Sequence, residues 1–208
     1  MADLTDLLAD LAAESADLDA LVSPLPPADW ARPTPAPRWT IAHQIAHLAW
    51  TDQVAVLAAT DAEAFFAAAA AIATDPDSYV DRAAEDFLAP PPDLLARWRA
   101  GRTALAEALR AVPAGTKLPW YGTRMSPMSM VTARLMETWA HGQDVADTLG
   151  VTRTPTARLR HVAYLGFRTL GYSFAAHGRP EPVVPIRVDL AAPASARSEL
   201  ASPAVASE

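Results

Sequence analysis

One segment, residues 130–150, constrains the fold of this chain more than any other. Its sequence, MVTARLMETWAHGQDVADTLG, contains Glu137, His141 and Asp144, which are spaced four and then three residues apart. Because an α-helix has 3.6 residues per turn, these side chains project from one face, and Arg134 lies one turn before them. Most of the flanking residues are apolar. We therefore expect a largely buried helix whose polar stripe faces inward.

A buried carboxylate and a buried imidazole need polar partners, because an isolated charge inside a protein is strongly destabilising. A second histidine-bearing segment, TIAHQIAHLAWTD, contains His43 and His47 one helical turn apart. One of these histidines, together with Glu137 and His141, would form a three-ligand site for a divalent metal ion with a position open for water or substrate. The alternative is a hydrogen-bonded network without metal, which is the commoner use of such a stripe.

The two histidine segments together resemble a known family. The motif WTIAHQIAHL at residues 39–48 and the E-x-x-x-H motif from Glu137 to His141 are similar to those of the DinB-like metal-binding superfamily. Within it, the resemblance is to the branch that includes the N-terminal domain of mycothiol-dependent maleylpyruvate isomerase. It covers roughly residues 1–180 in order and spacing.

The resemblance implies a ligand set and a chemistry. The residues that match the family's metal ligands are His47, Glu137 and His141. His43 is then structural or supports a ligand, although a rotated helix would bring it into the place of His47. Asp144 is expected to orient an imidazole or to be a further ligand. Zinc is the first expectation, and nickel, manganese and iron also fit. Family members of understood activity use the metal to activate a low-molecular-weight thiol, so mycothiol is the implied cosubstrate.

Three further residues are expected to border the site. Arg134 shares the face of the ligand helix, and Trp120 and Tyr121 lie in the 113–126 segment that leads into this helix. If this segment folds over the mouth of the bundle as a loop, its aromatic pair forms a pocket wall. Otherwise the pair packs as ordinary surface residues.

The spacing of the apolar residues predicts an all-α protein, and the resemblance implies a DinB-like four-helix bundle with one long crossover connection. Main helices are expected at residues 4–22, 41–59, 90–112 and 127–149, crossover helices at 61–73 and 78–88 around a turn at 75–77, and an extra C-terminal helix at 154–178. Arg99 and Arg102 on the third main helix are expected to form a solvated face or to reach an anionic substrate.

One principal domain is expected, followed by a short C-terminal segment. Residues 1–180 form the helical bundle, and residues 181–208 form one short strand at 186–190, without an obvious partner, and a flexible tail rich in Ala, Ser and Pro. In longer relatives of this branch a second, mixed domain follows such a strand, and we expect any contribution of that domain to the active site to be missing here.

Composition excludes several functional classes. The chain has no cysteine, which excludes disulfides, cysteine-ligated metals and a cysteine nucleophile, so any thiol must come from outside. A net charge of -7 argues against nucleic acid as a partner. No serine elbow, phosphate loop or dinucleotide fingerprint is present. No apolar run is long enough to span a membrane and the N-terminus is not basic, so we expect a cytoplasmic protein, and the Ala, Arg and Pro content is typical of a GC-rich bacterium.

The sequence thus predicts a divalent-metal-binding protein, with a metal-dependent thiol transferase or isomerase acting on an electrophilic substrate as the main interpretation. One alternative is a non-catalytic or stress-related bundle whose ion only stabilises the fold. The other is a metal-free helical protein that uses its apolar faces to bind a partner, a second copy of the chain included.

Overall fold

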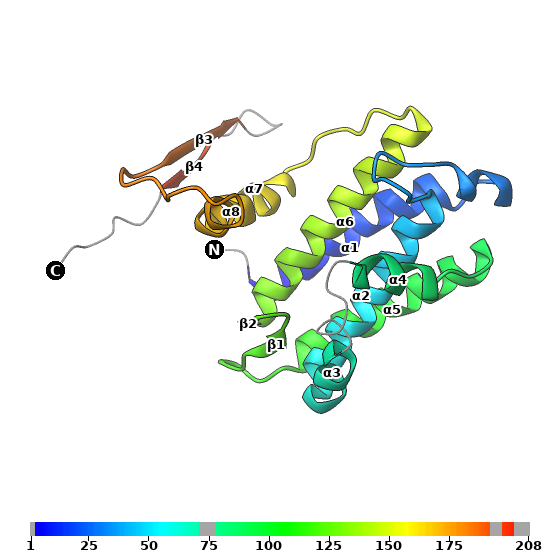
Figure 1. Cartoon of the computed structure of the whole chain (residues 1–208), viewed down its shortest axis with the longest axis horizontal. Coiled ribbons are helices and arrows are strands. Elements are labelled where there is room, and N and C mark those ends of the chain that lie inside the picture. Colours follow the sequence, from blue (N-terminus) through cyan, green and yellow to red (C-terminus); the bar gives the residue numbers. More distant parts are fainter. Residues whose placement is uncertain (1–2, 71–77, 192–196, 202–208) are drawn as a thin grey trace. The chain divides into compact units, whose positions relative to one another are not determined.

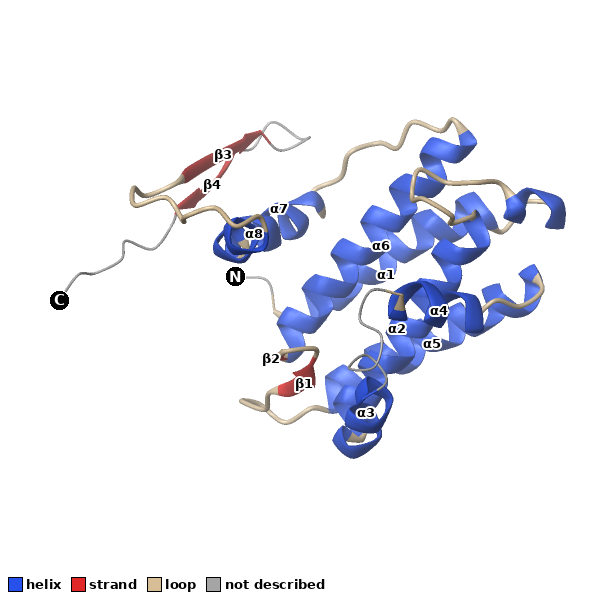
Figure 2. Ribbon diagram, viewed as in Figure 1, coloured by secondary structure: helices blue, strands red, loops and turns tan. Residues whose placement is uncertain are grey.

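The computed structural model describes residues 3–70, 78–191 and 197–201. They belong to two compact units, Met1–Arg153 and Thr154–Glu208, which are described separately below. Helices dominate the described part of the chain, as Figure 2 shows. None of the described helices is both long enough and apolar enough to cross a membrane.

The first unit is built on four long helices (Figure 1). They are α1 (Leu4–Val22), α2 (Ile41–Thr60), α5 (Pro91–Ala111) and α6 (Pro127–Leu149). Helix α2 packs against α5 and α6, and α1 packs against α6 and α5. Their apolar faces enclose a core that includes the fully buried Ile45, Trp98 and Leu135. The predicted all-α class and bundle are confirmed.

Local signals explain where the site helix α6 begins and ends. Its N-cap is Ser126, whose side chain accepts a hydrogen bond from the Ser129 backbone amide at 3.1 Å, and Pro127 is the first helical residue. Its last turn is closed by Gly150, which has a φ of 70°, a conformation that glycine adopts with little strain. Both ends were predicted from the sequence, because capping depends only on neighbouring residues.

The crossover between α2 and α5 contains two short helices, α3 (Ala62–Ala69) and α4 (Tyr79–Asp86). Helix α4 packs against α2. Asp81 of α4 also bonds to the segment that precedes α2. It accepts a hydrogen bond from Trp39 Nε1 at 2.8 Å and pairs with Arg38. The predicted turn at 75–77 and the last three residues of the predicted 61–73 helix lie outside the described residues.

The segment 113–126, predicted to be a loop, contains a small β-hairpin, which corrects the prediction. Its strands, β1 (Leu118–Trp120) and β2 (Thr123–Met125), precede α6, just as a short 3-10 helix, η1 (Pro27–Ala31), precedes α2. Gly122 has a φ of 69° in the two-residue turn between the strands. β1 packs against α2 and α3, and β2 against α6. These strands are too short, and too dependent on this packing, to show a periodic pattern in the sequence.

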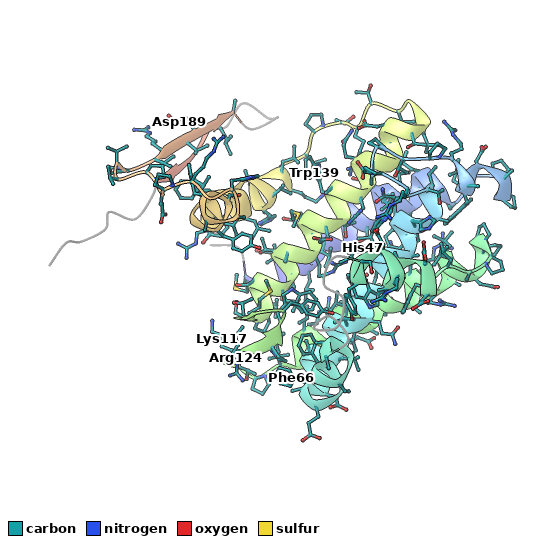
Figure 3. All side chains as sticks on the ribbon, in the orientation of Figure 1. His47, Phe66, Lys117, Arg124, Trp139 and Asp189 are labelled. Carbon is teal, nitrogen blue, oxygen red and sulfur yellow. The ribbon has the colours of Figure 1, made fainter. Side chains whose placement is uncertain are left out.

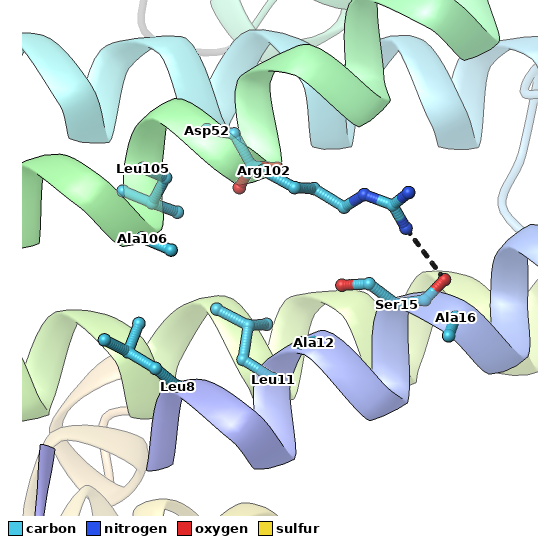
Figure 4. A pocket seen from close by; sticks show the side chains of 9 residues that line it. All are labelled: Leu8, Leu11, Ala12, Ser15, Ala16, Asp52, Arg102, Leu105 and Ala106. Carbon is cyan, nitrogen blue, oxygen red and sulfur yellow. Dashed lines mark hydrogen bonds between the residues drawn. The ribbon is translucent and has the colours of Figure 1, made fainter. Parts of the chain in front are cut away.

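Arg102 joins α5 to α1, and its side chain is half-buried. Its guanidinium donates to Asp19 Oδ2 at 2.9 Å and to the Ser15 carbonyl at 3.0 Å, and Arg99 also bonds Asp19. Beside this contact, a mainly apolar cavity of about 220 Å³ lies between α1 and α5, and Asp52 of α2 also lines it (Figure 4).

The second unit contains α7 (Leu159–Arg168), α8 (Leu170–Ala176), β3 (Arg187–Ala191) and β4 (Arg197–Ala201). The prediction of a single helix at 154–178 is wrong, because the helical backbone is interrupted at Thr169, where φ is -102° and ψ is 10°. The strand predicted at 186–190 has a partner, since β3 pairs with β4 in antiparallel register.

The remainder of the predicted tail, residues 192–196 and 202–208, lies outside the described residues. The predicted domain boundary near residue 180 stays a prediction, since the two units are divided by compactness alone.

Candidate metal centre

Helices α2 and α6 bring together the three side chains named from the sequence as metal ligands. His47 projects from α2 (Figure 3), and Glu137 and His141 project from α6. One donor atom from each of the three lies within 4.8 Å of the other two. In the described part of the chain, no other set of histidine and carboxylate side chains meets this criterion. The cluster joins residues that are about ninety positions apart in the sequence.

The distances within this cluster suit a shared cation. His47 Nε2 lies 3.1 Å from Glu137 Oε2, and His141 Nε2 lies 3.3 Å from the same oxygen. Ligand atoms bound to one tetrahedral zinc ion at ~2.1 Å lie about 3.4 Å from each other. Two imidazoles and one carboxylate are also a donor set that zinc commonly uses. The residues present therefore fit a divalent metal ion.

The three side chains of the cluster differ in their solvent exposure. The Glu137 side chain keeps 30% of its accessible surface, whereas His141 keeps 17% and His47 only 9%. Burial lowers the pKa of His47 to about 4, against the opposing effect of Glu137. Burial alone would raise the pKa of Glu137, but hydrogen bonds from His141 and His47 and the charge of Arg134 hold it well below the ordinary value. Neutral imidazoles and an ionised carboxylate are the forms that bind metal.

Gln44 is a site residue that the sequence reasoning missed. It is completely buried on α2, and its Oε1 is hydrogen-bonded to His141 Nδ1. Its Nε2 donates to Asp144 Oδ2 at 3.0 Å and to Thr34 Oγ1 at 2.8 Å. Asp144, expected to contact an imidazole or the metal, lies outside the three-residue cluster and reaches His141 only through Gln44. The available signal was a glutamine three residues before His47, next to His43 in a helix whose other residues there are apolar.

His43 has a structural position at the start of α2. Its Nδ1 accepts a hydrogen bond from the Thr40 backbone amide at 3.3 Å and lies 2.8 Å from the Thr40 hydroxyl. It thus takes the place of the Glu or Gln in a capping box. The rotation of α2 turns His47, and not His43, toward α6.

Arg134 lies beside Glu137 and forms a buried ion pair with Asp52. Its side chain is 2% exposed, its Nε donates to Asp52 Oδ1 at 2.9 Å, and its Nη1 lies 3.9 Å from Glu137 Oε2. Burial raises the pKa of Asp52, and the adjacent Arg134 charge opposes this rise. Arg134 was predicted to border the site, whereas Asp52, an acidic residue within an apolar stretch of α2, was not singled out.

Two tryptophans surround the imidazoles. The Trp39 ring is stacked on His141, with ring centroids 5.7 Å apart and planes inclined by 15°, and it lies 5.2 Å from His47. Trp50 meets His47 edge-on at 5.6 Å. These rings exclude water from one side of the cluster and restrict the imidazole orientations. Trp39 was part of the sequence motif but was not named as a site residue.

Trp120 and Tyr121, the expected pocket wall, pack against Phe65 of α3. Their ring centroids lie 6.0 Å and 5.5 Å from that of Phe65. Burial raises the pKa of Tyr121, and neighbouring Tyr79 raises it further. Tyr79 in turn lies 5.5 Å from Trp50. The hairpin is thus connected to the cluster through intervening aromatic rings, and no ring contact between it and the two histidines occurs among the described residues.

Residues 11–146 match the family described as the mycothiol maleylpyruvate isomerase N-terminal domain. The matched range contains His47, Glu137 and His141. Two uncharacterised proteins, from two strains of Mycobacterium tuberculosis, are 54% identical to this chain over 194 residues, which is 93% of this chain and 76% of each relative.

Solved structures show the same fold. The crystal structure of the mycothiol-dependent maleylpyruvate isomerase matches with a TM-score of 0.65 and 16% sequence identity, over 94% of this chain and 79% of that protein. A histidine-to-alanine mutant of that enzyme matches over the same shares, with a TM-score of 0.64 and 15% identity. At these identities the similarity concerns the fold alone.

Proposed function

The chain belongs to the mycothiol maleylpyruvate isomerase N-terminal domain family, and from this premise we propose that it is a metal-dependent enzyme acting with a low-molecular-weight thiol. The thiol is mycothiol or a close analogue, and the reaction is thiol transfer to, or thiol-assisted isomerisation of, an electrophilic small molecule. Zinc is the proposed metal, and nickel, manganese or iron are the alternatives. The mycobacterial relatives support a bacterial setting, and the cytoplasmic location expected from the sequence is part of the proposal.

The observation that carries this proposal is the convergence of His47, Glu137 and His141 from two helices. A hydrogen-bonded network can share one acceptor, but here one donor atom from each of the three side chains also lies close enough to the others to reach a shared ion. Here both Nε2 atoms approach the same oxygen of Glu137 at 3.1 and 3.3 Å. A divalent ion held there would act as a Lewis acid and lower the pKa of a thiol or water in its open position.

The protein residues provide the surroundings for this chemistry. Arg134 and Asp52 form a buried pair beneath Glu137, which keeps that carboxylate ionised and in place. Trp39 and Trp50 cover the imidazoles and exclude water. Glu137 is the most exposed of the three ligands, so substrates would approach from its side.

The test is the metal content of the full chain, purified without a His tag or chelator, for the natural protein and for His47→Ala and His141→Ala. His177→Ala, at an exposed histidine of the second unit, is the matched control. We expect about one metal ion per chain in the natural protein and the control, and near zero in both ligand variants.

Activity is then measured as the metal- and mycothiol-dependent isomerisation of maleylpyruvate, and as the metal-dependent consumption of mycothiol with simple electrophiles. A metal-free natural protein, even after incubation with zinc or nickel and desalting, would rule out the metalloenzyme. A metal-loaded protein that neither binds nor consumes a thiol would contradict the enzymatic proposal and favour the alternative of a bundle whose ion only stabilises the fold.

A further inference from the structure

We propose that Gln44 is a positioning residue that keeps a hydrogen on Nδ1 of His141, so that Nε2 is the nitrogen available to a metal ion held with Glu137 and His47. The role rests on the proposed function, because its purpose is to prepare His141 as a metal ligand. The tautomer itself is a property of the metal-free protein and can be tested without any metal.

The orientation of the Gln44 amide follows from its neighbours. The Thr34 hydroxyl donates its only hydrogen to the Trp39 carbonyl at 3.0 Å, so toward Gln44 it can only accept. On the other side, the amide faces a carboxylate oxygen of Asp144, which is also an acceptor. Both acceptors require the NH2 group of Gln44. A flipped amide would place its carbonyl oxygen against two acceptor oxygens inside the protein.

The amide orientation then determines the state of the imidazole. With its nitrogen committed to Thr34 and Asp144, Gln44 presents Oε1 to His141 Nδ1. A carbonyl oxygen can only accept, so Nδ1 must carry the hydrogen. Nε2 is then the nitrogen that faces the cluster, where it donates its hydrogen to Glu137 when protonated and offers its lone pair to a metal ion when deprotonated. This atom lies 3.3 Å from Glu137 Oε2.

The second imidazole of the cluster lacks such a partner. His47 Nδ1 is a buried atom without a hydrogen-bond partner. His47 is therefore oriented by its Nε2 contact with Glu137 and by the flanking tryptophan rings. Gln44 acts on one imidazole only. This asymmetry gives the test an internal reference, because a change at residue 44 should alter His141 and leave His47 unaltered.

The test is the tautomeric state of the histidines, read from ring 15N chemical shifts in two-bond 1H–15N NMR spectra of metal-free full chain at pH 8. The natural protein should show a hydrogen on His141 Nδ1. Gln44→Met, which retains length but cannot hydrogen-bond, should move His141 toward Nε2–H, because Nδ1 loses its acceptor. Gln53→Met, the same change at an exposed position of α2, is the control and should have no effect.

Zinc affinity provides the second measurement. We expect Gln44→Met to weaken zinc binding by roughly 10- to 100-fold, the usual effect of removing the hydrogen-bond partner of a ligand histidine, with Gln53→Met unchanged. Finding His141 Nδ1 without a hydrogen in the natural protein, which needs no variant, would overturn the proposal. So would an unchanged tautomer in a folded Gln44→Met protein. An Nδ1–H tautomer that depends on Gln44, in a protein that binds no metal, would retain the positioning role and reject the proposed function.

Discussion

At the scale of single residues, the site combines one carboxylate whose pKa is lowered and one imidazole whose pKa is lowered. The first effect arises because His141, His47 and Arg134 all favour the ionised form of Glu137. The second arises because His47 is buried among aromatic rings, where an imidazolium is poorly solvated. Both groups are therefore ready to bind a cation at neutral pH, and both make the metal-free protein sensitive to acid.

The first prediction concerns pH. His47 has a pKa of about 4 in the folded chain against an ordinary value of 6.5, so the unfolded chain binds more protons between these values. The free energy of unfolding should fall as the pH is lowered from about 6.5 to 4, by up to about 3 kcal/mol from this residue.

Urea unfolding with a chelator present, at several pH values in this window, measures the loss. His47→Gln should reduce the dependence on pH, and His177→Gln should leave it intact. A natural protein whose stability is constant between pH 6.5 and 4 would contradict the prediction.

The second prediction concerns the buried pair of Asp52 and Arg134. Asp52→Ala removes the partner of a guanidinium that is 2% exposed. The variant should lose about 3–5 kcal/mol, because the remaining charge is buried without compensation. The double variant Asp52→Leu with Arg134→Met should lose much less, since it leaves no buried charge. Urea unfolding of Asp52→Leu, of Arg134→Met and of the double variant gives the coupling energy. Additive losses would show that the two residues act independently.

At the scale of elements, α6 supplies two of the three cluster residues, so the position of its first turn matters. The third prediction is that Ser126→Ala lowers the free energy of unfolding by about 1 kcal/mol, because the Ser129 amide loses its acceptor. Ser126→Thr retains the oxygen and should be close to the natural protein. Thermal and urea unfolding of the two variants measure the difference, and equal losses would mean that the hydroxyl does not cap the helix.

The helices around the site were predictable, whereas their mutual contacts were not. Ser126 and Gly150 mark the ends of α6 through bonds to residues one turn away. By contrast, the hairpin before α6 depends on packing against α2 and α3, and β3 depends on a partner strand that begins six residues later. The interruption at Thr169 was also missed, because no proline or glycine occupies that position.

At the scale of the whole molecule, the candidate metal centre belongs entirely to the unit Met1–Arg153. Metal binding should therefore stabilise this unit and not the unit Thr154–Glu208. A ligand present at 100 times its Kd stabilises the state that binds it by about 2.7 kcal/mol.

The fourth prediction is that zinc slows amide hydrogen exchange in α2 and α6 of the full chain, by up to about 100-fold at that excess. Exchange in α7 and α8 should not change. His141→Ala should abolish the effect in α2 and α6. Equal protection of both units would show that zinc acts elsewhere on the chain, and its absence in a zinc-loaded protein would show that the ion is not held between α2 and α6.

The sequence by itself determined the helical class, the ends of the main helices and the set of acidic and imidazole side chains on one face of residues 130–150. These features follow from helical periodicity and from capping, which act between residues a few positions apart. Only the tertiary structure decided which residues of α2 meet that face. It placed His47 and not His43 there, and it added Gln44 and Asp52. The reason is that the rotation of one helix against another is set by side-chain packing over the whole contact, and residues 82 to 97 positions apart become hydrogen-bonded only once that packing exists.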